Sequence, residues 1–224
     1  MRTKFLLLSA ITFIGVPFSA AQADEDLSPW LVRVGYANAS FDTSATLKLA
    51  GTQVPGAVLD VPSKSLPLGE IGYELTDRWT ARLAIGPPPT VTVLAGGSLK
   101  QYSPPLSGVI GKLTIAPIIL SATYSLGDFS GLKPYIGAGI SYTIVIDTKD
   151  ADIVNIHAKN AWGSALQLGT DWVVDRHWSV FLDARKVFLK TTGTGTVTAL
   201  GSAAAWGEAS LDPLIVTAGV AYHF

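Results

Sequence analysis

The last fourteen residues of the chain, Leu211–Phe224, restrict the possible folds more than any other stretch. Every second residue back from the end is apolar, whereas the positions between them carry smaller or more polar residues. This period of two predicts a β-strand with two different faces. The strand ends on an aromatic residue, which is typical of a strand that closes a membrane barrel. An edge strand of a soluble sandwich is the alternative that this stretch alone leaves open. Reading back from the end, the apolar positions are Phe224, Tyr222, Val220, Ala218, Val216 and Leu214.

The first residues of the chain predict a secretory signal peptide. Arg2 and Lys4 precede an apolar run, Phe5–Val16, that is shorter than the ~20 residues of a transmembrane helix. Residues 21–23 read Ala-Gln-Ala, the small-x-small pattern of a cleavage site. We therefore expect residues 1–23 to be removed and residues 24–224 to form one domain in the cell envelope.

The composition favours a membrane barrel over a soluble sheet. Charged residues make up 15% of the chain, against about 25% in soluble domains. The mean hydropathy is +0.37, although no segment after the leader offers the ~18 continuous apolar residues of a spanning helix. A net charge of −1 gives no indication of nucleic-acid binding, and the absence of cysteine excludes disulfides and thiolate chemistry.

Eight stretches with period-two patterns are long enough to cross a bilayer as tilted strands. Three of their connections are short and the other four are long, which predicts short periplasmic turns and long outer loops. The fold expected from this pattern is all-β: an eight-stranded antiparallel transmembrane β-barrel. The strands are expected at residues 30–41, 66–75, 79–86, 112–126, 133–145, 162–174, 178–189 and 211–224, with long loops at 42–64, 87–110, 146–160 and 191–209.

Aromatic residues gather at the strand ends beside the short turns, which predicts a girdle at the periplasmic interface. They are Trp30, Tyr73, Trp79, Tyr124, Trp172, Trp178, Tyr222 and Phe224.

Charged residues fall on the opposite faces of the same strands and are expected to point into the barrel. Both signs occur, so they can pair across an interior that about eight strands fill with side chains. A polar pore is the alternative. The interior charges are Arg33, Glu70, Arg82, Asp171, Asp183 and Arg185.

The predicted outer loops are unusually apolar. Lys100 is the only charge in residues 87–110, and residues 191–207 carry none. Exposed apolar segments must cover one another, a hydrophobic ligand or a partner. We therefore expect a channel for passive uptake of small hydrophobic molecules. The alternative is a structural or adhesive barrel that binds partners through these loops.

Prolines near the outer end of two neighbouring strands predict a lateral exit to the membrane. Residues 87–89 are Pro-Pro-Pro, and Pro117 lies in the next strand, so both strands lose ladder donors. Because the axis is expected to be filled, a solute must leave sideways, between the third and fourth strands. The channel or gate candidates are Ile85, Pro87, Val91, Val93, Leu94, Ile115, Pro117 and Ile118.

No set of residues predicts an enzyme. The three histidines lie at the expected rim and in an outer loop, and none stands with a nucleophile and an orienting group. We assign no catalytic residue, no metal and no cofactor.

Several segments of the chain resemble the OmpW family of eight-stranded outer-membrane barrels. The resemblance implies a narrow barrel in the bacterial outer membrane, with a hydrophobic upper channel that passes small apolar molecules inward. It also implies that the barrel-insertion machinery reads the C-terminal strand through Phe224, so Phe224→Asp is expected to leave the protein in the periplasm. The segments are Tyr73–Asp77, Lys133–Tyr142, Trp162–Asp171, Leu211–Pro213 and Tyr222–Phe224.

Overall fold

The computed structural model describes residues 28–101, 108–198 and 201–224. The predicted signal peptide lies outside the described residues. None of the helical structure in these ranges is long and apolar enough to cross a membrane. The strands are β1 (Trp30–Ser40), β2 (Ser44–Leu49), β3 (Thr52–Gln53), β4 (Ala57–Asp60), β5 (Lys64–Glu74), β6 (Trp79–Ile85), β7 (Thr90–Gly97), β8 (Val109–Ser125), β9 (Leu132–Asp150), β10 (Val154–Ala158), β11 (Ala161–Val173), β12 (Trp178–Val197), β13 (Ala203–Ser210) and β14 (Leu214–His223).

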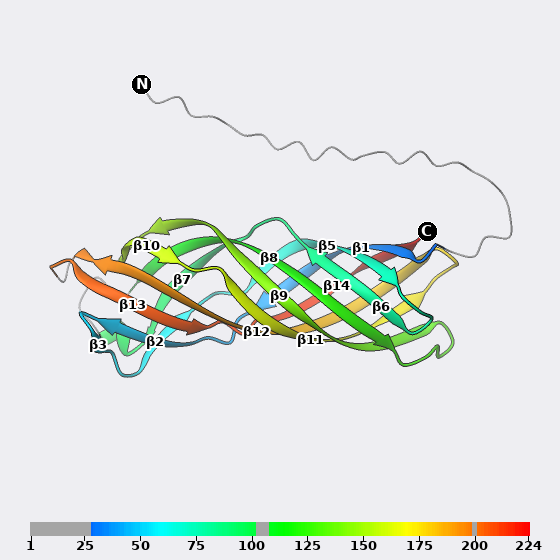
Figure 1. The fold of residues 1–224 in the computed structure, drawn as a ribbon, viewed down its shortest axis with the longest axis horizontal. Helices are drawn as coiled ribbons and strands as arrows, with labels where there is room; N and C mark the ends of the chain where they lie inside the picture. The colour runs from blue at the N-terminus through cyan, green and yellow to red at the C-terminus, as the bar shows by residue number, and fades with distance from the viewer. Residues whose placement is uncertain (1–27, 102–107, 199–200) are drawn as a thin grey trace, which may run out of the picture.

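Eight of these strands close into an antiparallel barrel, as the sequence predicts. The order around the wall is β1, β5, β6, β8, β9, β11, β12 and β14, and β14 pairs with β1 to close the ring. The molecule is a long tube with its tight turns and C-terminus at one end (Figure 1). Phe224 continues the closing ladder, because its backbone N–H donates to the Trp30 carbonyl at 3.2 Å.

Two strands, β9 and β12, run well past the ends that the sequence predicts, and short additional strands fill much of the four predicted long loops. The prediction that these segments are loops is therefore largely wrong. β9 and β12 contain 19 and 20 residues, against the roughly 9–11 that a bilayer requires. The outer segments pair with one another: β7 with β4 and β8, and β13 with β12 and β2. Backbone groups need partners, and the apolar side chains of these segments are buried when the strands extend.

The lipid-facing surface lies between two aromatic layers. At the inner end, Trp30 packs on Tyr73, Trp79 packs on Tyr124, and Trp178 and Phe224 pack on Tyr222. Trp162 lies ten residues before Trp172 on β11 and packs on Tyr142. At ~3.3 Å per residue and a tilt of ~40°, ten residues span about 25 Å, the height of the apolar band of such barrels. This outer layer was not predicted from the sequence.

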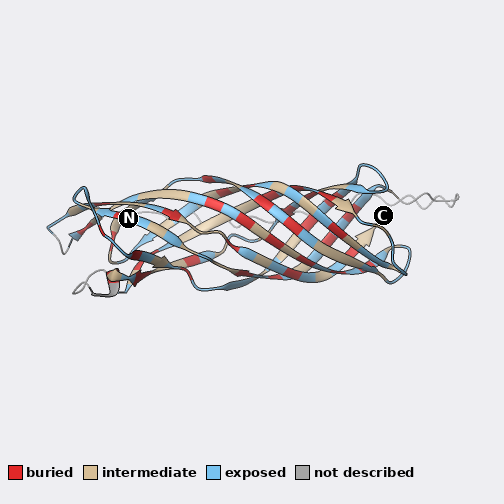
Figure 2. Cartoon of the chain, turned by 90° about the horizontal axis from the view of Figure 1, so that it is seen from below, coloured by how far each residue is buried: buried red, intermediate tan, exposed pale blue. Residues whose placement is uncertain are grey.

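Residues alternate between buried and exposed along the whole tube (Figure 2). On β1, Arg33 is 1% exposed while its neighbour Val34 is 56% exposed. The pattern therefore separates an apolar outside from an inside whose chemistry changes along the axis.

Candidate functional site

The six predicted interior charges lie together inside the inner half of the barrel. Five are at most 4% exposed, and Asp171 is partly buried. They come from six positions on β1, β5, β6, β11 and β12, so the cluster joins strands from all around the wall. Three arginines face three carboxylates, and the cluster carries no formal net charge.

Glu70 lies at the centre of this cluster. Its carboxylate is 3.1 Å from Arg82 Nη1 and 3.5 Å from Arg33 Nη1, and it also accepts a hydrogen bond from Arg185. Arg33 in turn pairs with Asp171. A carboxylate that three arginines share is compensated for the loss of its hydration.

Asp183 organises the neighbouring polar groups. It accepts hydrogen bonds from Tyr135 Oη at 2.7 Å and from Gln167 Nε2 at 2.6 Å, and its second oxygen is 2.9 Å from Arg185 Nε. The Tyr135 ring also lies beneath the guanidinium of Arg82, 4.6 Å from the ring centroid. Tyr135 was not singled out from the sequence, although it shares the inward face of β9 with two glycines.

Glycines opposite the large side chains show how full this half is. A Cβ on Gly169 would lie 2.4 Å from Tyr135 Oη, and one on Gly219 would lie 2.9 Å from the ring of Phe181. The large side chains therefore cross the lumen and fill space that is free only because the residue opposite is glycine. Together with the ion pairs, they close the axis of the inner half.

A short apolar layer lies above the charged cluster. Ala84, Ile119, Ala165 and Val187 are buried there and pack together, with Leu189 beside them. This layer separates the charges from the outer half.

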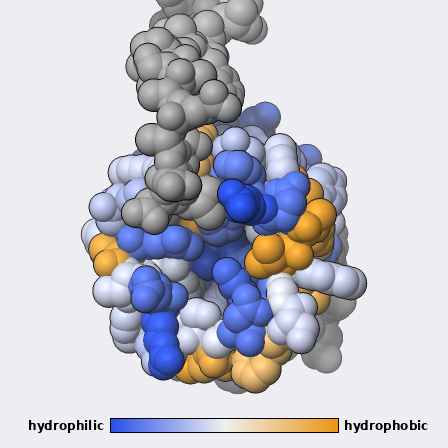
Figure 3. All heavy atoms as spheres, turned by 90° about the vertical axis from the view of Figure 1, so that its right-hand side faces the viewer, coloured by the Kyte–Doolittle hydropathy of each residue, from blue (hydrophilic) through white to orange (hydrophobic). Residues whose placement is uncertain are grey.

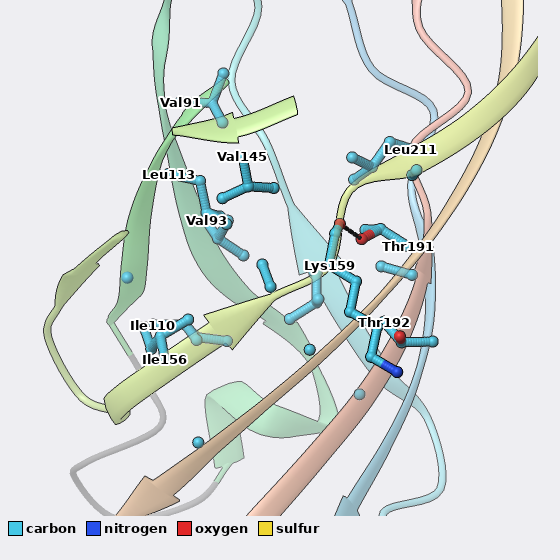
Figure 4. A pocket seen from close by; sticks show the side chains of 18 of the residues that line it. Val91, Val93, Ile110, Leu113, Val145, Ile156, Lys159, Thr191, Thr192 and Leu211 are labelled. Atoms are coloured by element: carbon cyan, nitrogen blue, oxygen red, sulfur yellow. Dashed lines mark hydrogen bonds between the residues drawn. The ribbon is translucent and has the colours of Figure 1, made fainter. Parts of the chain in front are cut away.

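The outer half contains an apolar cavity of about 160 Å³. Val93, Leu113 and Val145 line one side, and Leu189 and Leu211 lie toward its inner end (Figure 4). The volume is close to the roughly 150 Å³ of an apolar protein cavity that holds benzene. The outer half can therefore hold a molecule of about one ring.

The outermost segments pack over this cavity and explain the apolar loops. They form a second buried cluster that includes Leu47, Leu99, Ile110 and Val197. The loop side chains thus cover one another as well as the cavity. Two apolar residues of the predicted loops, Leu106 and Leu200, lie outside the described residues.

The predicted gate candidates are split between the cavity and the wall. Val91, Val93 and Ile115 line the cavity, and Leu94 lies farther out on β7. On the wall, Ile85 is 46% exposed, Pro87 is exposed, and Pro117 and Ile118 are half-buried.

The third and fourth predicted strands do not separate at the prolines. Ile85 lies opposite Ile118 and Thr90 opposite Thr114, so β6 and β7 follow β8 with a one-residue bulge between them. The gap predicted between these strands is therefore misplaced.

The missing hydrogen bonds lie on the other edge of the proline segment. The β5–β6 ladder ends at Gly69–Ile85, and the β4–β7 ladder begins at Asp60–Leu94. Among the described residues, no backbone hydrogen bond joins residues 61–68 to residues 86–93. Val61 and Val91, on the two sides of this gap, are both buried and both line the cavity. Apolar side chains thus close an unpaired stretch of wall.

The inner end contrasts with the apolar cavity. Viewed along the axis, hydrophilic residues occupy much of this end, and hydrophobic residues lie around its rim (Figure 3). The asymmetry agrees with a tube whose inner end faces water.

Comparison with known proteins gives a consistent result. The model described as the OmpW family matches residues 28–224. The dibenzothiophene metabolism operon protein PahQ of Pseudomonas aeruginosa is 36% identical over 197 residues, covering 88% of this chain and 89% of PahQ. The crystal structure of outer membrane protein OprG of Pseudomonas aeruginosa aligns with a TM-score of 0.79 at 23% identity, covering 88% of this chain and 97% of OprG. Outer membrane protein AlkL, solved in lipid bilayers, aligns with a TM-score of 0.67 at 22% identity, covering 94% and 97%. These two likenesses support the fold.

Proposed function

Because the chain belongs to the OmpW family, whose barrels lie in the outer membrane, we propose that it is a channel for passive uptake of small hydrophobic molecules. The apolar cavity in the outer half carries this proposal. A porin for hydrophilic solutes would line its lumen with charged groups. Here the charged groups pair with one another in the inner half.

The name of one relative agrees with an apolar substrate. PahQ is named after an operon for the metabolism of dibenzothiophene, a flat apolar heterocycle. We infer that this chain admits compounds of the same broad class.

The solute leaves sideways rather than along the axis. The charged cluster blocks the way inward, and moving an apolar molecule through it would separate paired charges. The unpaired wall between residues 61–68 and 86–93 offers the shorter route, since Val61 and Val91 line the cavity there and no backbone hydrogen bonds join the two segments.

Filling the cavity tests the proposal. Val145 lines it, whereas the next residue, Ile146, is 55% exposed on the outer surface. Val145→Trp should reduce uptake of labelled toluene by host cells that lack their own OmpW-type barrels, and Ile146→Trp is the matched control. Equal uptake by both variants, at equal levels in the membrane, would overturn the cavity as the route.

Restoring the wall tests the exit. Replacing Pro87 and Pro88 with valine returns two backbone donors to the segment beside the gap. The double variant should slow uptake while leaving toluene binding unchanged. Amide hydrogen exchange at the two introduced valines and at Ser65 reports whether the ladder has closed, because the Leu66 and Leu68 amides face β1. If the ladder closes and uptake stays the same, the exit lies elsewhere.

The structure gives less support to the adhesive alternative. The apolar side chains of the outer segments are buried in their own cluster. A partner would therefore find a mainly polar surface there.

A further inference from the structure

A one-residue bulge interrupts the wall beside the cavity. Ala158 lies opposite Gly193, whereas Gly163 lies opposite Leu189. Five steps along β10 and β11 thus match four steps along β12. Bulges re-aim side chains, and they are common beside functional sites.

The bulge turns Lys159 toward the cavity. Ala158, Lys159 and Ala161 all line the cavity, so the alternation of inward and outward residues breaks here. The Lys159 backbone N–H donates to the Thr192 carbonyl at 3.0 Å, and its carbonyl accepts from Thr191 Oγ1 at 3.0 Å (Figure 4). These two hydrogen bonds fix the backbone of Lys159 at the bulge.

Asn160 completes this arrangement on the other side of the chain. Its side-chain oxygen accepts from the Val145 N–H at 2.9 Å, and its amide donates to Tyr142 Oη at 3.2 Å. The Asn160 amide thus replaces a ladder bond that the bulge removes.

Among the described residues that line the cavity, Lys159 is the only charged one. In the described part of the chain its ammonium has no carboxylate within 4.0 Å, since every ion pair found there joins other residues. Lys159 is exposed to solvent at the mouth, and Thr191, Thr192 and Thr194 belong to the same wall. The facing wall is made of valine, leucine and isoleucine side chains (Figure 4).

We propose that this mouth binds the carboxylate of a small amphiphile, with the Lys159 ammonium as the donor and the apolar body in the cavity. This inference rests on the proposed function and narrows its substrates to compact carboxylates of about one ring. One ammonium matches a single negative charge. Lys48, by contrast, lies over the ring of Trp206 at 5.2 Å.

Benzoate and toluene separate the two parts of this site. Binding of each labelled compound is measured at neutral pH to the full barrel in lipid nanodiscs, with empty nanodiscs subtracted. In Lys159→Gln, benzoate affinity should fall about three- to tenfold, while toluene affinity stays the same. Added salt should weaken benzoate binding to the unmodified protein and leave toluene binding unchanged.

Two further variants control for charge and folding. Lys159→Arg retains the positive charge and should keep most of the benzoate affinity. Lys190→Gln removes an exposed lysine that does not line the cavity, and should change neither affinity.

The outcomes distinguish this inference from the proposed function. A benzoate affinity unchanged in Lys159→Gln would overturn the carboxylate site even if toluene binds and enters cells. Benzoate binding that depends on Lys159, without any toluene uptake, would support the carboxylate site and overturn the hydrophobic channel. Failure of benzoate to bind the unmodified protein would overturn the site as well.

Discussion

The two halves of the barrel are built from the same strands but have opposite interiors. In the inner half, inward positions carry arginines, carboxylates and Tyr135, whose contacts cross the lumen and leave only a smaller pocket of about 80 Å³ at the inner end. In the outer half, inward positions of the same strands carry valine, leucine and isoleucine, and a cavity remains. On β12 the change takes place between Arg185 and Leu189. Strand alternation fixes the inner and outer faces, whereas the residue types on the inner face decide which half is open.

The largest effect is expected from removing the central carboxylate. Glu70→Gln keeps the shape but leaves three arginines with one anion fewer, which should lower the free energy of unfolding by about 3–5 kcal/mol. Glu208→Gln, at an exposed position of the outer half, is the control. Urea unfolding in lipid vesicles measures both. A loss below about 1 kcal/mol for Glu70→Gln would mean that the cluster is hydrated, and the contrast between the halves would disappear.

A pair of glycine substitutions compares the free space in the two halves. Gly169→Ala places a methyl group 2.4 Å from Tyr135 Oη and should destabilise the barrel by about 1–3 kcal/mol. Gly193→Ala, beside the cavity, meets its nearest atom at 3.6 Å and should be neutral or stabilise by up to about 1 kcal/mol. The same unfolding experiment applies. Similar losses in both variants would show that the outer half is packed as tightly as the inner half.

The smallest effect tests one hydrogen-bonding group within the inner half. Tyr135→Phe removes the donor to Asp183 and the acceptor for Arg33 Nη1, and should lower stability by about 1–2 kcal/mol. Tyr142→Phe, which loses a bond to Asn160 on the outer surface, should change stability by less than about 0.5 kcal/mol. If the two variants lose the same free energy of unfolding, burial of the inner network contributes little to stability.

The sequence predicts the barrel and its inward charges well because both depend on local alternation. The parity that places Val34 outside places Arg33 inside, whatever the partner strand. Which charges pair depends on side chains from strands far apart in the sequence, so the central place of Glu70 could not be predicted. The gap was placed on the wrong edge for a similar reason, since it depends on the distant pairing of Asp60 with Leu94.

Lys159 shows a different limit of sequence reasoning. It lies in a stretch that the sequence assigns to an outer loop, where a lysine is ordinarily solvated. The bulge that turns it inward is visible only when the registers of β10 and β11 on β12 are compared. The sequence signal was weak, because Lys159 shares its stretch with other charged residues, among them Lys149, Asp150 and Asp152.

Contacts of a bound solute test the difference between the halves most directly. The measurement is the set of intermolecular NOEs from toluene to methyl groups of the barrel in lipid nanodiscs. A solute that binds in the outer half should give NOEs to Val93, Val145 and Leu189, which line the outer cavity. NOEs to the buried methyls of Thr123, Thr217 or Ala221 in the inner half, or none to the outer three, would contradict it.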